Sequence, residues 1–64
     1  MFIQYTFSED GTRNPEALFF IKIEPFHKCA FYLERIGGKW DAVDFDEAVD
    51  WIKNNKSSII RIDK

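Results

Sequence analysis

Residues 44–52 read DFDEAVDWI, and this segment is the strongest structural signal in the chain. Asp44 is followed three residues later by Glu47, a spacing typical of a helix N-terminus whose first side chain caps free backbone N–H groups. Four apolar residues recur at the spacing i, i+3, i+4 and i+7, which places them on one side of a helix: Phe45, Ala48, Val49 and Ile52. Asn54 and Asn55 are typical of a left-handed helix end. We therefore expect one amphipathic helix that packs by a single apolar stripe.

The segments on either side of this helix alternate apolar and polar residues in the manner of β-strands. The alternation predicts strands over residues 1–7, 17–23, 29–36 and 58–62, divided by polar loops and turns. The expected fold class is α+β: a single small domain over 1–64 with the order β-β-β-α-β and a mostly antiparallel four-stranded sheet with the helix packed on one face. Because the helix crosses back over the sheet, we expect the last strand to run parallel to the first, beside it at the sheet edge.

The composition excludes several classes of protein. With 64 residues, 45% hydrophobic and 31% charged, the chain has the length of one domain and the makeup of a folded protein rather than a disordered or fibrous one. Its single cysteine cannot form an internal disulfide, which favours a reducing, cytoplasmic setting. The longest apolar run, residues 17–21, is too short to cross a membrane, and the N-terminus lacks the basic and apolar regions of a signal peptide.

One helix can cover only one side of such a sheet, so the alternation also predicts two faces. The helix-covered face is expected to hold Ile3, Tyr5, Phe7, Phe19, Ile21, Ile23, Phe31, Leu33, Ile60 and Ile62. The opposite face is expected to hold Phe2, Leu18, Phe20, Tyr32, Ile36 and Ile59, interspersed with Gln4, Thr6, Lys22, Glu24, Glu34 and Arg61. Exposed aromatic residues rimmed by charges are typical of a partner-binding surface. Alternatively, these residues shield one another or lie under loops, and a shift of one residue in register would exchange the faces.

The helix offers a second candidate surface. Asp46, Glu47 and Asp50 are expected to share its outward face, where they would attract a basic partner. The structural alternative is that acids near a helix N-terminus interact favourably with the helix dipole. Trp51 lies at the border of the apolar stripe and is either a binding hot spot or a cover over the edge of the core. Trp40 is expected to cover the core beneath the start of the helix.

No catalytic constellation is recognisable, and we expect a protein that is not an enzyme and that binds neither a cofactor nor a metal. Nucleophilic catalysis requires a nucleophile beside a base that a third group orients, and the chain has one histidine and one cysteine. His27 and Cys29 share one side of an extended segment, but a structural zinc site takes four ligands. The simpler interpretation is a loop histidine followed by a buried thiol.

These observations predict a small non-catalytic protein that binds another protein through the aromatic sheet face, the acidic helix face, or both. The expected partner-binding residues are Phe2, Leu18, Phe20, Tyr32, Asp46, Glu47, Asp50 and Trp51. Small proteins encoded by phages and other mobile elements, including inhibitors of host transcription or of CRISPR defence, are often of this type. We therefore expect a modulator or inhibitor.

Three alternatives to this function remain open at the level of sequence. The chain is a structural subunit of a larger complex, a homodimer, or a sheet platform on which single-stranded nucleic acid stacks. Against nucleic acid stand the net charge of −2 and the expected presence of Glu24 and Glu34 beside the aromatic residues. No membrane partner is expected.

Overall fold

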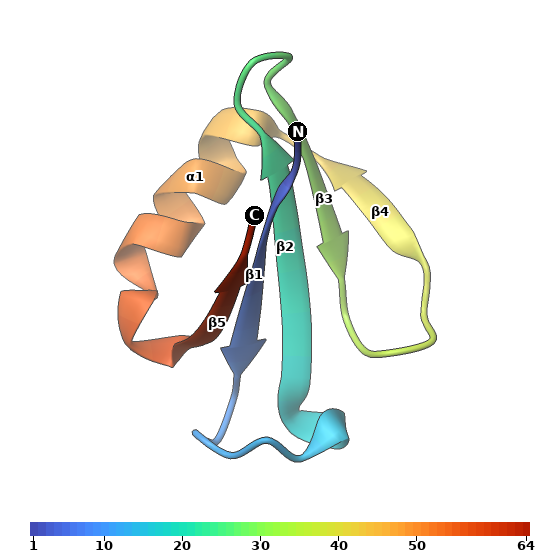
Figure 1. The fold of residues 1–64 in the computed structure, drawn as a ribbon, viewed down its shortest axis with the longest axis vertical. Helices are drawn as coiled ribbons and strands as arrows, with labels where there is room; N and C mark the ends of the chain where they lie inside the picture. The colour runs from blue at the N-terminus through green and yellow to red at the C-terminus, as the bar shows by residue number, and fades with distance from the viewer.

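The chain forms one five-stranded sheet with a single helix on one of its faces (Figure 1). The computed structural model describes all of residues 1–64. In chain order the elements are β1 (Ile3–Ser8), the 3₁₀ turn η1 (Pro15–Ala17), β2 (Leu18–Glu24), β3 (Cys29–Leu33), β4 (Trp40–Val43), α1 (Phe45–Asn54), the 3₁₀ turn η2 (Lys56–Ser58) and β5 (Ile59–Asp63). The sheet order is β4-β3-β2-β1-β5 and every neighbouring pair is antiparallel, which confirms the α+β class with one helix and an antiparallel sheet.

The prediction of four strands in the order β-β-β-α-β is wrong, because β4 (Trp40–Val43) adds a fifth strand before the helix. A strand of four residues that follows two glycines is too short to establish a period-two pattern. The additional strand reverses the direction in which the chain enters α1. As a result β5 is antiparallel to β1 instead of parallel, although it lies beside β1 at the sheet edge as expected.

Helix α1 begins as the sequence predicts and ends differently. The side chain of Asp44 accepts a hydrogen bond from the backbone N–H of Glu47 at 3.1 Å, which satisfies one of the free donors of the first turn. At the other end Asn55 has a φ of −126°, so the expected left-handed stop is absent. Instead, the side-chain amide of Asn55 donates to the carbonyl oxygen of Trp51 at 2.7 Å, and its backbone N–H donates to that of Ile52.

The core lies between α1 and one face of the sheet. Its fully buried centre is Phe7, whose ring stacks on Phe19 at 5.2 Å between centroids and meets the edge of Trp51 at 4.9 Å. The other buried members of this core are Ile21, Ile23, Ala30, Ala48 and Ile52. The apolar stripe predicted for the helix is therefore the surface that α1 packs against the sheet, with Phe45 and Val49 partly buried beside the core.

The faces predicted for β3 are exchanged in the structure. Tyr32 pairs with Ile21 and Ala30 pairs with Ile23, so Ala30 and Tyr32 face the helix, whereas Phe31 and Leu33 lie on the opposite face. The prediction placed the bulkier residues inside. The structure places Ala30 there, where it is buried in the core with Ala48 of the helix, because small side chains allow the helix and sheet to approach closely.

The faces predicted for β5 are also partly wrong. A register shift between Thr6 and Phe7 places Ile59 opposite Phe7, on the helix side, while Ile62 lies opposite Tyr5 on that same side as expected. Ile60 instead lines a hollow on the opposite face, with Gln4 and Thr6 of β1. A β-bulge of this kind interrupts the alternation by one residue, which exchanges the sides of the residues before it.

Candidate functional site

The helix-covered face is not completely closed, and a groove of about 400 Å³ remains between α1 and strands β2, β3 and β4. Six apolar or aromatic side chains and two carboxylates line it: Phe19, Ile21, Tyr32, Val43, Ala48, Trp51, Glu9 and Glu47. We call this the acidic groove. It joins residues from the first loop, three strands and the helix, so only the folded chain creates it.

The acidic groove exists because the helix presents side chains of very different size to the sheet. Ala48 is buried at the base and leaves room above the strands, whereas Trp51, one helical turn further on, extends over the sheet. The indole of Trp51 packs edge-on against Phe7 and Phe19 and is nevertheless 38% exposed. Trp51 is thus both a cover over the core and an accessible wall of the groove. Val43 on the edge strand β4 forms an exposed apolar wall as well.

The two carboxylates of the groove are held by local structure and take part in no ion pair of the chain. Glu47 belongs to the first turn of α1, where a negative charge interacts favourably with the helix dipole. Glu9 follows β1, and its backbone N–H donates to the carbonyl oxygen of Ala17 at 2.9 Å. Burial raises the pKa of the Tyr32 hydroxyl above its usual value near 10, and the charges of Glu34 and Glu9 raise it further. The acidic groove therefore carries two carboxylates that form no ion pair with a cation of the chain.

The structure separates the residues predicted for the helix surface. Glu47 and Trp51 line the acidic groove, whereas Asp46 and Asp50 are exposed on α1 outside it. Glu9 and Val43 belong to the groove and were not among the predicted site residues. No local pattern connects them to the helix, since Glu9 lies in the first loop and Val43 in the strand that the alternation did not reveal.

A second groove of about 560 Å³ lies on the other side of the helix, toward β1 and β5. Its apolar lining is formed by Tyr5, Ile23, Val49, Ile52, Ile59 and Ile62. The charged residues that line it are Lys53 and Lys56, so its polarity is opposite to that of the acidic groove. Helix α1 therefore separates an acidic apolar surface from a basic one.

The predicted aromatic sheet face differs from the observed one. Tyr32 lies on the helix side, and Phe20 is only 8% exposed, so neither ring is available on the open face. Leu18 is half-buried there. Of the predicted apolar binding residues on this face, Phe2 is the exposed one, at 42%. Phe20 is shielded by the chain's own neighbouring residues, whereas Tyr32 lies on the other face because the register of β3 differs; the sequence left both alternatives open.

A different aromatic cluster lies on this open face, and sequence analysis missed it. The ammonium group of Lys22 lies 4.2 Å from the ring centroid of Trp40, 5.1 Å from that of Phe2 and 5.5 Å from that of Phe31. We call these four residues the Lys22 cluster. Trp40 is part of it because it starts β4 opposite Leu33, so it does not cover the core beneath the helix as predicted. Phe31 joins it through the exchanged faces of β3.

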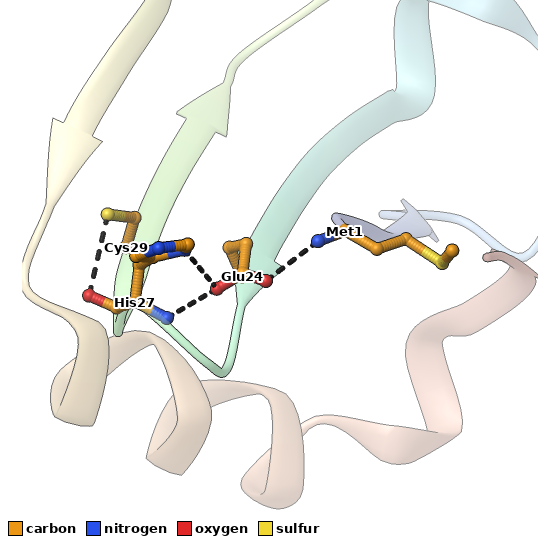
Figure 2. Close-up of polar contacts among 4 residues, drawn as sticks. All are labelled: Met1, Glu24, His27 and Cys29. Carbon is orange, nitrogen blue, oxygen red and sulfur yellow. Dashed lines mark hydrogen bonds and ion pairs between the residues drawn. The ribbon is translucent and has the colours of Figure 1, made fainter.

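The turn between β2 and β3 is tied to the N-terminus through Glu24 (Figure 2). The carboxylate of Glu24 accepts a hydrogen bond from the Met1 ammonium at 2.7 Å and from the backbone N–H of His27, with the His27 ring nitrogen Nδ1 3.2 Å away. The Met1 ammonium, and then the His27 N–H, lower the pKa of Glu24 to about 2. Cys29 is exposed rather than buried as expected, and its thiol donates to the carbonyl oxygen of His27.

The chain contains no cluster of three or more His, Cys, Asp or Glu side chains that could hold a metal ion. None of its helices has the length and apolar character that a bilayer crossing requires. No protein-family model, curated protein or solved structure matches the chain.

Proposed function

We propose that the chain is a non-catalytic protein-binding protein whose acidic groove holds a basic, apolar segment of a partner protein. The observation that carries the proposal is the combination of an exposed tryptophan wall with two unpaired carboxylates around an apolar floor. Tryptophan is the residue type most enriched at binding hot spots, and hot spots lie in apolar pockets with a polar rim.

The chemistry of the groove favours one kind of partner. Its apolar floor accepts one or two large aliphatic or aromatic side chains, and its carboxylates Glu9 and Glu47 favour Lys or Arg beside them. A short amphipathic segment, with basic residues flanking an apolar anchor, supplies both features. Further acids on the helix, Asp46 and Asp50, are placed to steer such a segment toward the groove.

The expected affinity follows from the size of the groove. Each large apolar side chain that becomes buried contributes about 1.5–3 kcal/mol, and association itself costs at least about 4 kcal/mol. Two buried anchors therefore exceed that cost by no more than about 2 kcal/mol, so we expect weak binding that depends on charge complementarity as well. A partner segment that is bound in the acidic groove cannot contact other molecules. We therefore propose that the protein is a modulator or inhibitor of its partner.

The proposal is tested with two designed peptides of about 15 residues, the length at which helices become marginally stable in water. One carries Leu and Lys at helical spacing, and in the other every Lys is replaced by Glu. Titration calorimetry should detect binding of the Lys peptide alone, weakening as salt is raised.

Glu47→Lys and Asp46→Lys form a matched pair for this experiment. Both replace an exposed acid in the first turn of α1, so they change the net charge and the helix dipole interaction alike, but only Glu47 lines the groove. Glu47→Lys should weaken binding at least tenfold, and Asp46→Lys should mainly slow association. Equal weakening by the two variants, or binding of both peptides alike, would exclude the acidic groove as the site.

A further inference from the structure

The open face of the sheet carries a different set of charges from the one that its sequence predicts. Glu34 was expected there and instead lines a hollow with Glu9, Glu16 and Arg35, and its charge raises the pKa of Tyr32 on the helix side. Glu24 is present, but its carboxylate is neutralised by the Met1 ammonium. The two carboxylates that argued against nucleic acid on this face are therefore displaced or paired.

Lys22 and Arg13 are positive groups on the open face that take part in no ion pair. Lys22 lies opposite Gln4 on β1 and takes part in none of the three ion pairs of the chain. Arg13 and Arg61 line a hollow of about 400 Å³ on the same face, where Arg61 pairs with Asp63 at 3.0 Å. The carboxylates on this face, Glu24 and Asp63, each pair with a cation of the chain, whereas Lys22 and Arg13 do not pair.

The Lys22 cluster combines this positive charge with aromatic surface. Phe2 is 42% exposed, and the rings of Phe31 and Trp40 are half-buried, which leaves part of each ring open to a ligand. Phe2 and Phe31 lie 5.9 Å apart between centroids. Aromatic side chains beside a cation on an uncovered sheet face are the arrangement on which bases stack while the cation meets a phosphate.

We infer that the Lys22 cluster binds single-stranded nucleic acid. One or more bases stack on Trp40 and Phe2, and the Lys22 ammonium turns from the rings toward a phosphate. Arg13, which lines a hollow on the same face, supplies a second unpaired positive charge for the backbone. This site lies on the face opposite the acidic groove, so it is independent of the proposed function.

The test uses fluorescein-labelled oligothymidine and oligouridine of about 15 nucleotides, with anisotropy measured at about 50 mM salt and above. Comparison of the two oligonucleotides shows whether the site binds DNA, RNA or both. The wild-type chain should bind at least one of them, and the logarithm of the binding constant should fall with the logarithm of salt with a slope of about −1.4 for two phosphates contacted.

Matched variants locate the site. Phe2→Ala should weaken binding about tenfold, since it removes a stacking ring that precedes β1 and whose loss leaves the strand intact. Phe26→Ala removes an equally large ring from the exposed turn after β2 and should have no effect. Lys22→Gln should lower the steepness of the salt dependence by about 0.7, whereas Lys53→Gln, on the helix side, should leave it unchanged.

Far-ultraviolet circular dichroism should confirm that each variant is folded, and Trp40→Leu provides a further variant that keeps a bulky apolar residue in β4. The inference is overturned if neither oligonucleotide binds at about 50 mM salt. It is also overturned if Phe2→Ala, Trp40→Leu and Lys22→Gln all bind as the wild type does. A third outcome would also overturn it: the wild type binds the Glu-containing peptide but not the oligonucleotides, and Lys22→Gln does not bind that peptide. The open face would then be a protein-binding surface.

Discussion

Replacement of Phe7 by alanine tests whether one ring holds the helix on the sheet. Phe7 is the one large side chain with no exposed surface, and it contacts Phe19 on the sheet and Trp51 on the helix. A buried Phe→Ala substitution lowers the free energy of unfolding by about 3–5 kcal/mol. Two well-oriented aromatic contacts, each contributing about 0.5–1.5 kcal/mol beyond the buried area, place Phe7→Ala at the upper end of that range.

The loss is large compared with the stability that a chain of this size can have. At about 0.05–0.15 kcal/mol per residue, 64 residues give a free energy of unfolding of about 3–10 kcal/mol. We therefore expect Phe7→Ala to be partly or wholly unfolded at 25 °C. If enough native protein remains, the thermal midpoint should fall by more than about 12 °C.

The control is the same substitution at a position without contacts in the core. Phe26 is 85% exposed in the turn after β2, so Phe26→Ala should change the free energy of unfolding by no more than about 0.5 kcal/mol. Urea titration followed by tryptophan fluorescence and by circular dichroism measures both variants. The reasoning is refuted if Phe7→Ala loses less than about 1 kcal/mol, or if the two variants lose the same amount.

Two further predictions concern the ends of secondary-structure elements. Because the pKa of Glu24 is lowered from its usual value near 4.5 to about 2 in the folded chain, its stabilising effect is complete above about pH 4.5 and is lost as the pH falls toward 2. The difference in urea midpoint between the wild type and Glu24→Gln should therefore shrink across that interval; a constant difference would contradict the pairing with the Met1 ammonium. Asp44→Ala should lower the free energy of unfolding by about 1 kcal/mol by leaving the Glu47 N–H unpaired, whereas Asp44→Asn should retain most of the stability; equal losses would contradict capping.

The parts of the fold that depend on local pattern are those that sequence reasoning identified. The helix start at Asp44 and its apolar stripe follow from contacts between residues three or four apart, and a single sequence contains that information. The same is true of the alternation in β1 and β2, whose predicted faces agree with the observed pairing of Tyr5 with Ile21 and of Phe7 with Phe19.

The candidate site was only partly predictable, and the reason is register. Both faces of this sheet carry aromatic residues, so hydrophobic alternation does not distinguish the inner from the outer side of β3, and Phe31 and Tyr32 were assigned to the wrong faces. Glu47 and Trp51 were identified because they lie on the helix. Glu9 and Val43 could not be, since nothing local relates them to it.

The amino-acid order alone specifies where the helix begins, which of its sides is apolar, and which segments are extended, because each of these depends on near neighbours in the chain. The pairing of strands depends on contacts between residues far apart in sequence. Those contacts add β4, turn β5 antiparallel to β1, and bring Lys22 among Phe2, Phe31 and Trp40. They also bring Glu9 and Glu47, from the first loop and the helix, into one groove, because the helix packs against the sheet.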